Sequence, residues 1–102
     1  MKKLIRDKIP QLIEDKSRLS QISDPKLVRE YVAAKVLEEA QELSEALLSG
    51  TEDDILEESA DLYETILKTL TISKLTEIQM FRKSLAKDRE KGAFDDNWIL
   101  EV

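Results

Sequence analysis

Residues 35–62 read KVLEEAQELSEALLSGTEDDILEESADL, and this stretch sets the architecture of the chain. On both sides of Gly50, apolar residues recur every three or four positions, which is the spacing of an amphipathic helix. Gly50 supplies a stop for the first helix, and the acidic run of residues 52–54 complements the positive end of the second. The stretch therefore predicts two helices joined as an antiparallel hairpin about Gly50.

The boundaries of this hairpin are predicted by local signals. Asp24-Pro25 marks the start of the first helix, because aspartate is a good N-cap and proline fits the first helical position. We expect this helix to run to Ser49. The second helix is expected to begin near Thr51 or Glu52 and to reach about Leu70.

Two further helices and a tail are expected outside the hairpin. A short helix is predicted from about Asp7 to Ser17, because proline is tolerated in a first turn. Ser73 is predicted to cap a helix that ends at Gly92. The tail over residues 93–102 is rich in apolar residues, and we expect it to pack on helices. The predicted fold is an all-α, four-helix bundle, with residues 1–102 forming a single domain.

The composition supports this class and excludes several others. Of 102 residues, 41% are hydrophobic and 37% are charged, a mixture that suits amphipathic helices, while two glycines and two prolines are too few for the turns of a β-sandwich. The chain has no cysteine and no histidine, which excludes disulfides, Cys or His zinc sites and Ser-His-Asp catalysis. Any metal must therefore be held by oxygen ligands, as hard cations are.

The charge and the apolar runs limit the expected partners and location. A net charge of −6 argues against binding to a nucleic-acid backbone, which needs clustered Lys and Arg. The start of the chain is interrupted by charges before any apolar run develops, unlike a signal peptide. No apolar stretch approaches the roughly 20 residues that span a bilayer. We expect a cytoplasmic protein.

Four acidic residues fall in phase on the two hairpin helices. On a helical wheel Glu39 lies inside the apolar stripe and Glu42 at its edge; Glu58 and Asp61 have the same phase on the next helix. Each pair is spaced i, i+3, and in an antiparallel hairpin about Gly50 the two pairs stand level. The stripes themselves are formed by Val32, Val36, Leu43 and Leu47 and by Ile55, Leu62 and Ile66.

Four converging carboxylates require a counter-charge, because burying even one unpaired carboxylate is costly. One explanation without a functional role is that some of the 22 acidic side chains fall in phase by chance and pair with Lys or Arg. Two in-phase pairs, level across one turn, favour instead a magnesium site, since Mg²⁺ prefers oxygen ligands and is commonly shared with substrate phosphates.

The acidic motifs resemble a known signature. EExxE at residues 38–42 followed by ExxD at residues 58–61 is similar to the signature of the MazG-like all-α nucleoside triphosphate pyrophosphohydrolases, a superfamily that includes dUTPases, dCTP pyrophosphatases and phosphoribosyl-ATP pyrophosphohydrolase. The opening KLIRDKIP, residues 3–10, resembles the KLVRDKIP start of a small single-domain branch. KDREKGAF, residues 87–94, resembles the KxxxRGxF segment of that branch, with Lys91 in the place of its usual arginine.

The resemblance implies an activity and a set of site residues. The implied reaction is hydrolysis of a nucleoside triphosphate between its α and β phosphates, giving the monophosphate and pyrophosphate. Mg²⁺, with Mn²⁺ as a substitute, would be held by Glu39, Glu42, Glu58 and Asp61. Glu38 points away from the stripe and is either a supporting group or proton acceptor, or an ordinary surface residue. The candidate substrate-binding residues are Lys8, Lys87, Lys91 and Asn97. Alternatively, the lysines are ordinary solvated side chains and Asn97 caps a turn.

Two other functions remain open at this stage. The substrate could be phosphoribosyl-ATP, with the same chemistry, or the chain could be a non-catalytic helical module whose acidic groove binds a basic partner. Apolar residues outside the main stripes, such as Leu37 and Leu56, indicate a second packing face. The resemblance likewise implies that chains share a helical bundle, so a homodimer or a dimer of dimers is expected.

Overall fold

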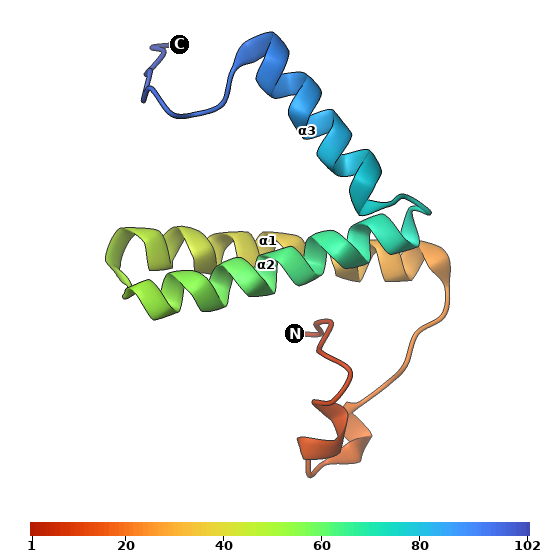
Figure 1. The fold of residues 1–102 in the computed structure, drawn as a ribbon. Helices are drawn as coiled ribbons and strands as arrows, with labels where there is room; N and C mark the ends of the chain where they lie inside the picture. Colours follow the sequence, from red (N-terminus) through yellow and green to blue (C-terminus); the bar gives the residue numbers. More distant parts are fainter.

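The computed structural model describes residues 1–102 and contains three α-helices, two one-turn 3₁₀ helices and no strand (Figure 1). The all-α class is therefore confirmed, whereas four helices in one chain is wrong. The elements in order are the 3₁₀ helices Pro10–Leu12 and Lys16–Arg18, then α1 (Pro25–Ser49), α2 (Glu52–Ile72) and α3 (Glu77–Lys91). None of the helices combines the length and the apolar composition that a membrane crossing requires.

The hairpin helices begin and end at the residues whose chemistry favours it. The Asp24 side chain accepts a hydrogen bond from the Lys26 N–H, and Pro25 takes the first helical position of α1. Thr51 and Asp54 form a capping box at the start of α2, each side chain accepting from the other residue's N–H. The structure extends α2 to Ile72, two residues beyond the expected end.

Gly50 permits the tight connection between α1 and α2. Its N–H donates to the Ala46 carbonyl at 2.8 Å, which closes the last turn of α1. A Cβ added at Gly50 would lie 2.8 Å from that same oxygen and 3.1 Å from the Asp54 Cβ, so no larger residue fits without a shift. The close approach of the two helices is therefore tied to the absence of a side chain here.

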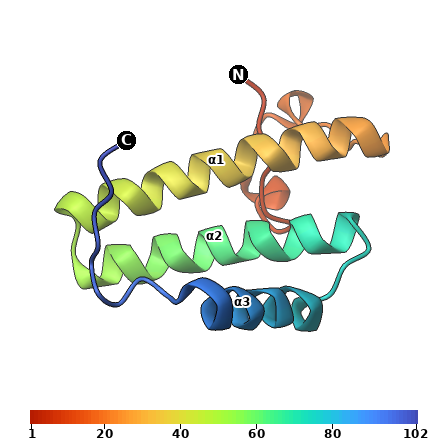
Figure 2. The same cartoon turned by 90° about the horizontal axis from the view of Figure 1, so that it is seen from above.

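The two helices lie side by side and antiparallel along their length (Figure 1, Figure 2). All four buried residues of the chain belong to this pair, and they are Val32, Glu39, Ala46 and Thr65. The seam between α1 and α2 is consequently the core of the single chain, and a glutamate lies inside it.

The predicted helix over residues 7–17 is absent, and local hydrogen bonding explains why. Ile13 is extended, with ψ 123°, directly after the single turn that Pro10 starts. Asp15 then accepts hydrogen bonds from both the N–H and the hydroxyl of Ser17, an alternative to helical bonding that short polar side chains offer. This segment instead follows an irregular path on one side of the hairpin (Figure 1).

The start of α3 also differs from the prediction. Ser73 ends α2 rather than capping α3, because its N–H bonds back to carbonyls of the last turn, and Lys74 follows with φ 58°. Thr76 is the actual N-cap, in a capping box with Gln79. The predicted end at Gly92, with φ 81°, is confirmed; at this φ glycine is favoured because it lacks a Cβ.

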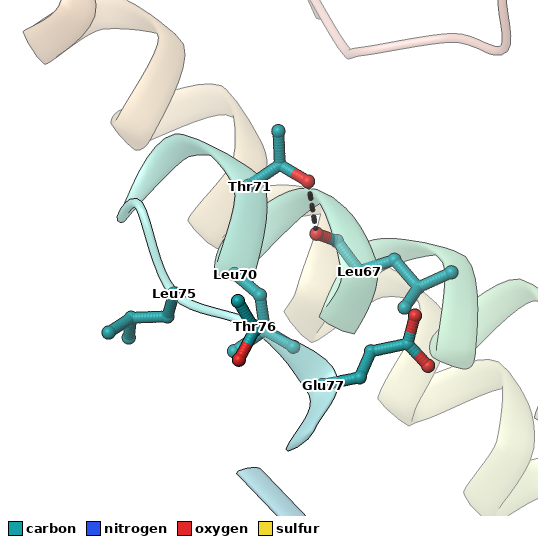
Figure 3. A pocket seen from close by; sticks show the side chains of 6 residues that line it. All are labelled: Leu67, Leu70, Thr71, Leu75, Thr76 and Glu77. Carbon is teal, nitrogen blue, oxygen red and sulfur yellow. Dashed lines mark hydrogen bonds between the residues drawn. The ribbon is translucent and has the colours of Figure 1, made fainter. Parts of the chain in front are cut away.

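The corner between α2 and α3 is a half-open hollow of about 360 Å³ (Figure 3). From this corner α3 rises away from the hairpin, so its far end does not lie against α1 or α2 (Figure 1). The hollow is lined by Leu67, Leu70, Thr71, Leu75, Thr76 and Glu77.

Most of the apolar side chains of α3 and the tail are exposed. Phe94 is 98% exposed and Trp98 is 90% exposed. The expectation that the tail around Trp98 packs on helices is therefore wrong for the single chain. The tail does not cover the exposed apolar residues of the hairpin either, since Leu37, Leu48 and Leu56 are about 70% exposed or more.

Candidate metal centre

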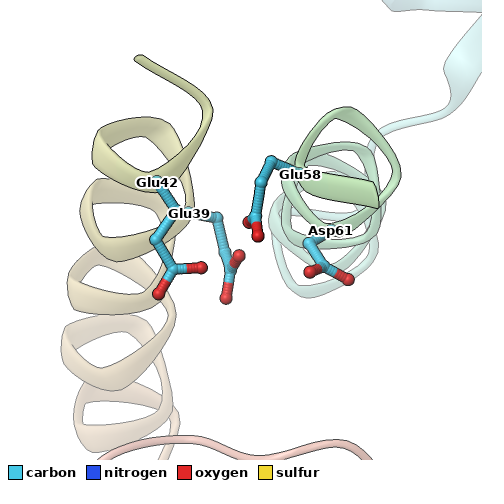
Figure 4. A group of neighbouring side chains, drawn as sticks. All are labelled: Glu39, Glu42, Glu58 and Asp61. Atoms are coloured by element: carbon cyan, nitrogen blue, oxygen red, sulfur yellow. The ribbon is translucent and has the colours of Figure 1, made fainter. Parts of the chain in front are cut away.

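The four in-phase acidic residues converge at one level of the seam. Glu39 and Glu42 come from α1, and Glu58 and Asp61 come from α2. Each offers a carboxylate oxygen, and these four oxygens all lie within 4.8 Å of one another. Figure 4 shows the carboxylates pointing to the same side of the gap between the two helices. The level arrangement expected from their positions about Gly50 is present in the structure.

Two oxygens of this cluster are buried without a partner. Glu39 is only 6% exposed, and its Oε2 atom accepts no hydrogen bond. Glu58 Oε2 is likewise buried and unpartnered. A buried carboxylate oxygen that no donor reaches is costly, and a bound cation would be the simplest compensation.

Two carboxyl groups of the cluster, those of Glu39 and Glu42, have a raised pKa and hold their protons more tightly than usual. The pKa of Glu42 is raised by a hydrogen bond between its carboxyl group and that of Glu58, and further by burial. The pKa of Glu39 is raised by burial, against the opposing effect of a hydrogen bond from Lys35. Burial contributes to both shifts in pKa, and so does the charge of a neighbouring carboxylate, which is Glu42 for Glu39 and Glu58 for Glu42.

Lys35 is a resident cation at the edge of the cluster. Its Nζ atom lies 2.8 Å from Glu38 Oε2 and 3.3 Å from Glu39 Oε1, and its side chain is 18% exposed. The hydrogen bond from Lys35 lowers the pKa of Glu38, so that carboxylate stays charged. Lys35 thus takes one oxygen of Glu39 and leaves the unpartnered Oε2 for the cluster.

Two further cations, Arg6 and Lys3, come from the N-terminal segment. The Arg6 Nη2 atom lies 2.6 Å from Asp61 Oδ1, and Lys3 Nζ lies 3.5 Å from Glu38 Oε1. Arg6 and Lys35 were not among the residues that sequence reasoning selected for the site. The sequence gives only weak signals for them: Arg6 lies inside the KLIRDKIP opening, and Lys35 lies one helical turn before Glu39. The contact between Arg6 and Asp61 could not be predicted, because it depends on the path of an irregular segment.

Comparison with known families identifies the family of the chain. Residues 6–87 match the phosphoribosyl-ATP pyrophosphohydrolase family. The chain belongs to this family. Comparisons with curated proteins and with solved structures give no significant match. The predicted resemblance to this superfamily is confirmed, and it places the chain among hydrolases that act on nucleotide-like substrates.

The family match covers all four carboxylates together with Arg6 and Lys35, and it ends at residue 87, before the candidates Lys91 and Asn97. Lys91 is the last residue of α3, and Asn97 lies in the tail with φ 57°, a conformation that asparagine tolerates after a turn. Lys8 and Lys87 are exposed, and neither forms an ion pair with the cluster. The structure of the single chain does not bring these four residues to the carboxylates.

The donor set fits a hard divalent cation. All the candidate ligands are carboxylate oxygens, and the cluster lies partly open to solvent at Glu42, Glu58 and Asp61, which leaves room for waters or phosphate oxygens. Members of a pyrophosphohydrolase family typically need such a metal. The hollow of Figure 3 lies at the far end of α2 and shares no residue with this site.

Proposed function

We propose that this chain is a Mg²⁺-dependent pyrophosphohydrolase that cleaves a nucleoside triphosphate between its α and β phosphates, releasing the monophosphate and pyrophosphate. The observation that carries the proposal is the four-carboxylate cluster with two buried, unpartnered oxygens. Its position within the family match adds the reaction class. Mn²⁺ should substitute for Mg²⁺, because it accepts the same oxygen ligands.

In this proposal Glu39, Glu42, Glu58 and Asp61 hold the cation. Bound Mg²⁺ would offset charge on the phosphate oxygens and increase the acidity of the attacking water. Glu39 is the most constrained ligand, because it is buried and Lys35 fixes one of its oxygens. The cluster is thereby pre-positioned before substrate arrives.

The proton of the attacking water passes to a carboxylate, since the chain has no histidine. Glu38 is a supporting residue in this proposal, held next to the cluster by Lys35 and Lys3. Lys8, Lys87, Lys91 and Asn97 remain candidate substrate-binding residues, and they reach the phosphates only if substrate binding or a second chain brings them closer.

The second candidate substrate is phosphoribosyl-ATP, and one observation favours it: the family that matches residues 6–87 is described by that activity. The chemistry at the cluster would be the same, since the bond cleaved is again a phosphoanhydride. The non-catalytic acidic module has less support, because the chain belongs to an enzyme family. It would show a complex with a basic protein that forms without metal.

The proposal includes a single domain over residues 1–102 that assembles as a homodimer or a dimer of dimers. One chain exposes 9407 Å², whereas a compact monomer of this mass exposes about 5,900 Å². Its radius of gyration is 17.0 Å, against about 13 Å for a compact chain of similar length. The excess surface is large enough for a stable interface, and its exposed apolar residues include Leu37, Leu56, Phe81, Leu85 and Trp98.

A substrate screen tests the activity. Purified protein with Mg²⁺ is incubated with canonical, deoxy and modified nucleoside triphosphates and with phosphoribosyl-ATP, and pyrophosphate release is measured. Glu58→Gln should abolish release from the best substrate, whereas Glu57→Gln, which changes the exposed neighbouring carboxylate, should not. Release that is unaffected by Glu58→Gln or by chelation of divalent metal would refute the proposal.

A further inference from the structure

The N-terminal segment delivers an arginine to the outermost ligand of the proposed metal site. Arg6 Nη2 lies 2.6 Å from Asp61 Oδ1, although the two residues are 55 positions apart in the chain. In Figure 4 the N-terminal ribbon crosses on the open side of the four carboxylates. The contact is therefore made across the mouth of the site, on the side from which a cation or a phosphate would enter.

We propose that Arg6 is an exchangeable counter-ion: it pairs with Asp61 in the metal-free protein, and it turns to a substrate phosphate when Asp61 becomes a metal ligand. This inference rests on the proposed function. The guanidinium occupies Asp61 Oδ1 at 2.6 Å and places a positive charge beside the four carboxylates, so a cation that binds Asp61 is repelled by Arg6 and competes with it for the charge of that carboxylate.

The exposure of Lys35 and Arg6 distinguishes the roles of these two cations. The Lys35 side chain is 18% exposed and belongs to α1 itself, bridging Glu38 and Glu39 from within one helical turn. The Arg6 side chain is 57% exposed and comes from a segment without α-helix. An exposed ion pair contributes a factor of about five or less to an equilibrium constant, so a divalent cation can displace Arg6 at little cost.

The backbone at Arg6 keeps the guanidinium close after displacement. The Arg6 carbonyl accepts a hydrogen bond from the Ile9 N–H at 3.0 Å, and the neighbouring Ile5 and Ile9 side chains are half-buried. The side chain can therefore swing while its Cα stays beside the hairpin. The guanidinium can leave Asp61 and reach a phosphate without unfolding of the N-terminal segment.

The charge balance at the site indicates what the released arginine would bind. The five carboxylates, with Glu38 included, exceed the three cations Lys3, Arg6 and Lys35 by two charges, which one divalent ion neutralises. A polyphosphate then adds negative charge, and the guanidinium that Asp61 has released is the nearest uncommitted cation. Arginine binds phosphate through two parallel N–H groups, which a lysine does not.

Isothermal titration of Mn²⁺ into the substrate-free protein tests the exchange. Arg6→Ala should bind Mn²⁺ about two- to fivefold more tightly than the wild type, because no cation has to be displaced. Arg18→Ala is the matched control, since it removes the same charge from the same segment but has no ion pair. In an Asp61→Asn background, removing Arg6 should give no further tightening.

A second titration measures the other half of the exchange. With Mn²⁺ at saturating concentration, inorganic pyrophosphate should bind Arg6→Ala about tenfold more weakly than the wild type, as expected for loss of a bidentate charged contact. Arg6→Lys should give a smaller loss. The result that supports the proposal is thus a change of opposite sign in the two titrations.

The outcomes separate this inference from the function on which it rests. If Mn²⁺ binds Arg6→Ala equally or more weakly than the wild type, or as tightly as Arg18→Ala, Arg6 is not a competing counter-ion and the proposal is wrong. Unchanged pyrophosphate binding would also overturn it. If the wild type binds no Mn²⁺ at all, the proposed metal centre itself fails, and the inference fails with it.

Discussion

The α1–α2 hairpin and the α3 helix have very different surroundings. All the buried side chains of the chain lie in the hairpin, whereas α3 contributes none, and its Phe81 and Leu85 are about half exposed. Capping does not explain the difference, because α2 and α3 begin with the same kind of capping box.

The difference lies in where each apolar face finds a partner. Gly50 folds α2 back on α1, so two faces that are neighbours in sequence cover each other at a small cost in loop entropy. The corner after Ile72 directs α3 away, and no other helix of the chain remains to cover it. The proposed catalytic carboxylates belong to the region that one chain completes, and the proposed assembly surface belongs to the region that it does not.

The largest expected effect is on the rate of pyrophosphate release, and it tests whether the reaction takes place at the hairpin. Glu39→Gln alters the buried, proposed metal ligand that Lys35 fixes, and we expect pyrophosphate release to fall at least about a hundredfold. Glu90→Gln, an exposed carboxylate on α3, should leave the rate within a factor of two of wild type. Equal losses in a steady-state assay would contradict the assignment of the chemistry to the hairpin.

The next prediction tests α3 as an interface. Phe81→Glu combined with Leu85→Glu should convert the assembly into monomers at micromolar concentration, because buried charges oppose association. Light scattering would show the mass fall to about one half or one quarter, according to whether the native state is a dimer or a tetramer. Lys83→Glu on the same helix is the charge control. A wild type that is already monomeric and active would refute the assembly.

Metal binding should stabilise the hairpin. At a concentration of Mg²⁺ one hundred times its Kd, linkage predicts about 2.7 kcal/mol of added stability. Asp61→Asn should remove most of this gain in thermal melts with and without Mg²⁺. Asp53→Asn, an exposed carboxylate at the start of α2, should retain it. A full gain in Asp61→Asn would show that the ligand set is wrong.

The metal-free protein should lose stability as the pH rises above the ordinary glutamic acid range. The folded-state pKa values of Glu39 and Glu42 are raised above 4.5, so the native state binds more protons than the unfolded state between the unfolded and folded values. Stability is then highest below that window and falls through it. Urea unfolding at several pH values should show this slope, and Glu42→Gln should reduce it. A stability that rises with pH in this window would contradict the shift.

The smallest effect compares the two capping boxes. Thr51→Ala should cost about 1 kcal/mol of unfolding free energy, because α2 folds as part of the hairpin. Thr76→Ala should cost a similar amount in the assembled protein and much less in the Phe81→Glu, Leu85→Glu background, where α3 has no partner. Equal costs of Thr76→Ala in both backgrounds would show that α3 is coupled to the hairpin within one chain.

Much of the hairpin could be predicted from sequence because its determinants are local. The N-cap at Asp24 and the stop at Gly50 depend on residues within one turn of the helix end, and both are confirmed. The phase of Glu39 and Glu58 followed from helical periodicity alone. The prediction of an N-terminal helix was wrong because the Asp15 side chain accepts hydrogen bonds that helical backbone would otherwise make. Hydrophobic periodicity contains no information about this competition.

By itself, the sequence determined the all-α class, the ends of α1 and the level of the four carboxylates, since each depends on the regular 3.6-residue turn and on short-range capping. Only the tertiary structure decided that Arg6 reaches Asp61, that Lys35 leaves one oxygen of Glu39 free, and that α3 turns away from the hairpin. These features depend on the path of irregular segments and on which oxygen a side chain offers. Such details are set by packing in three dimensions, because no periodic rule links residues so far apart in the chain.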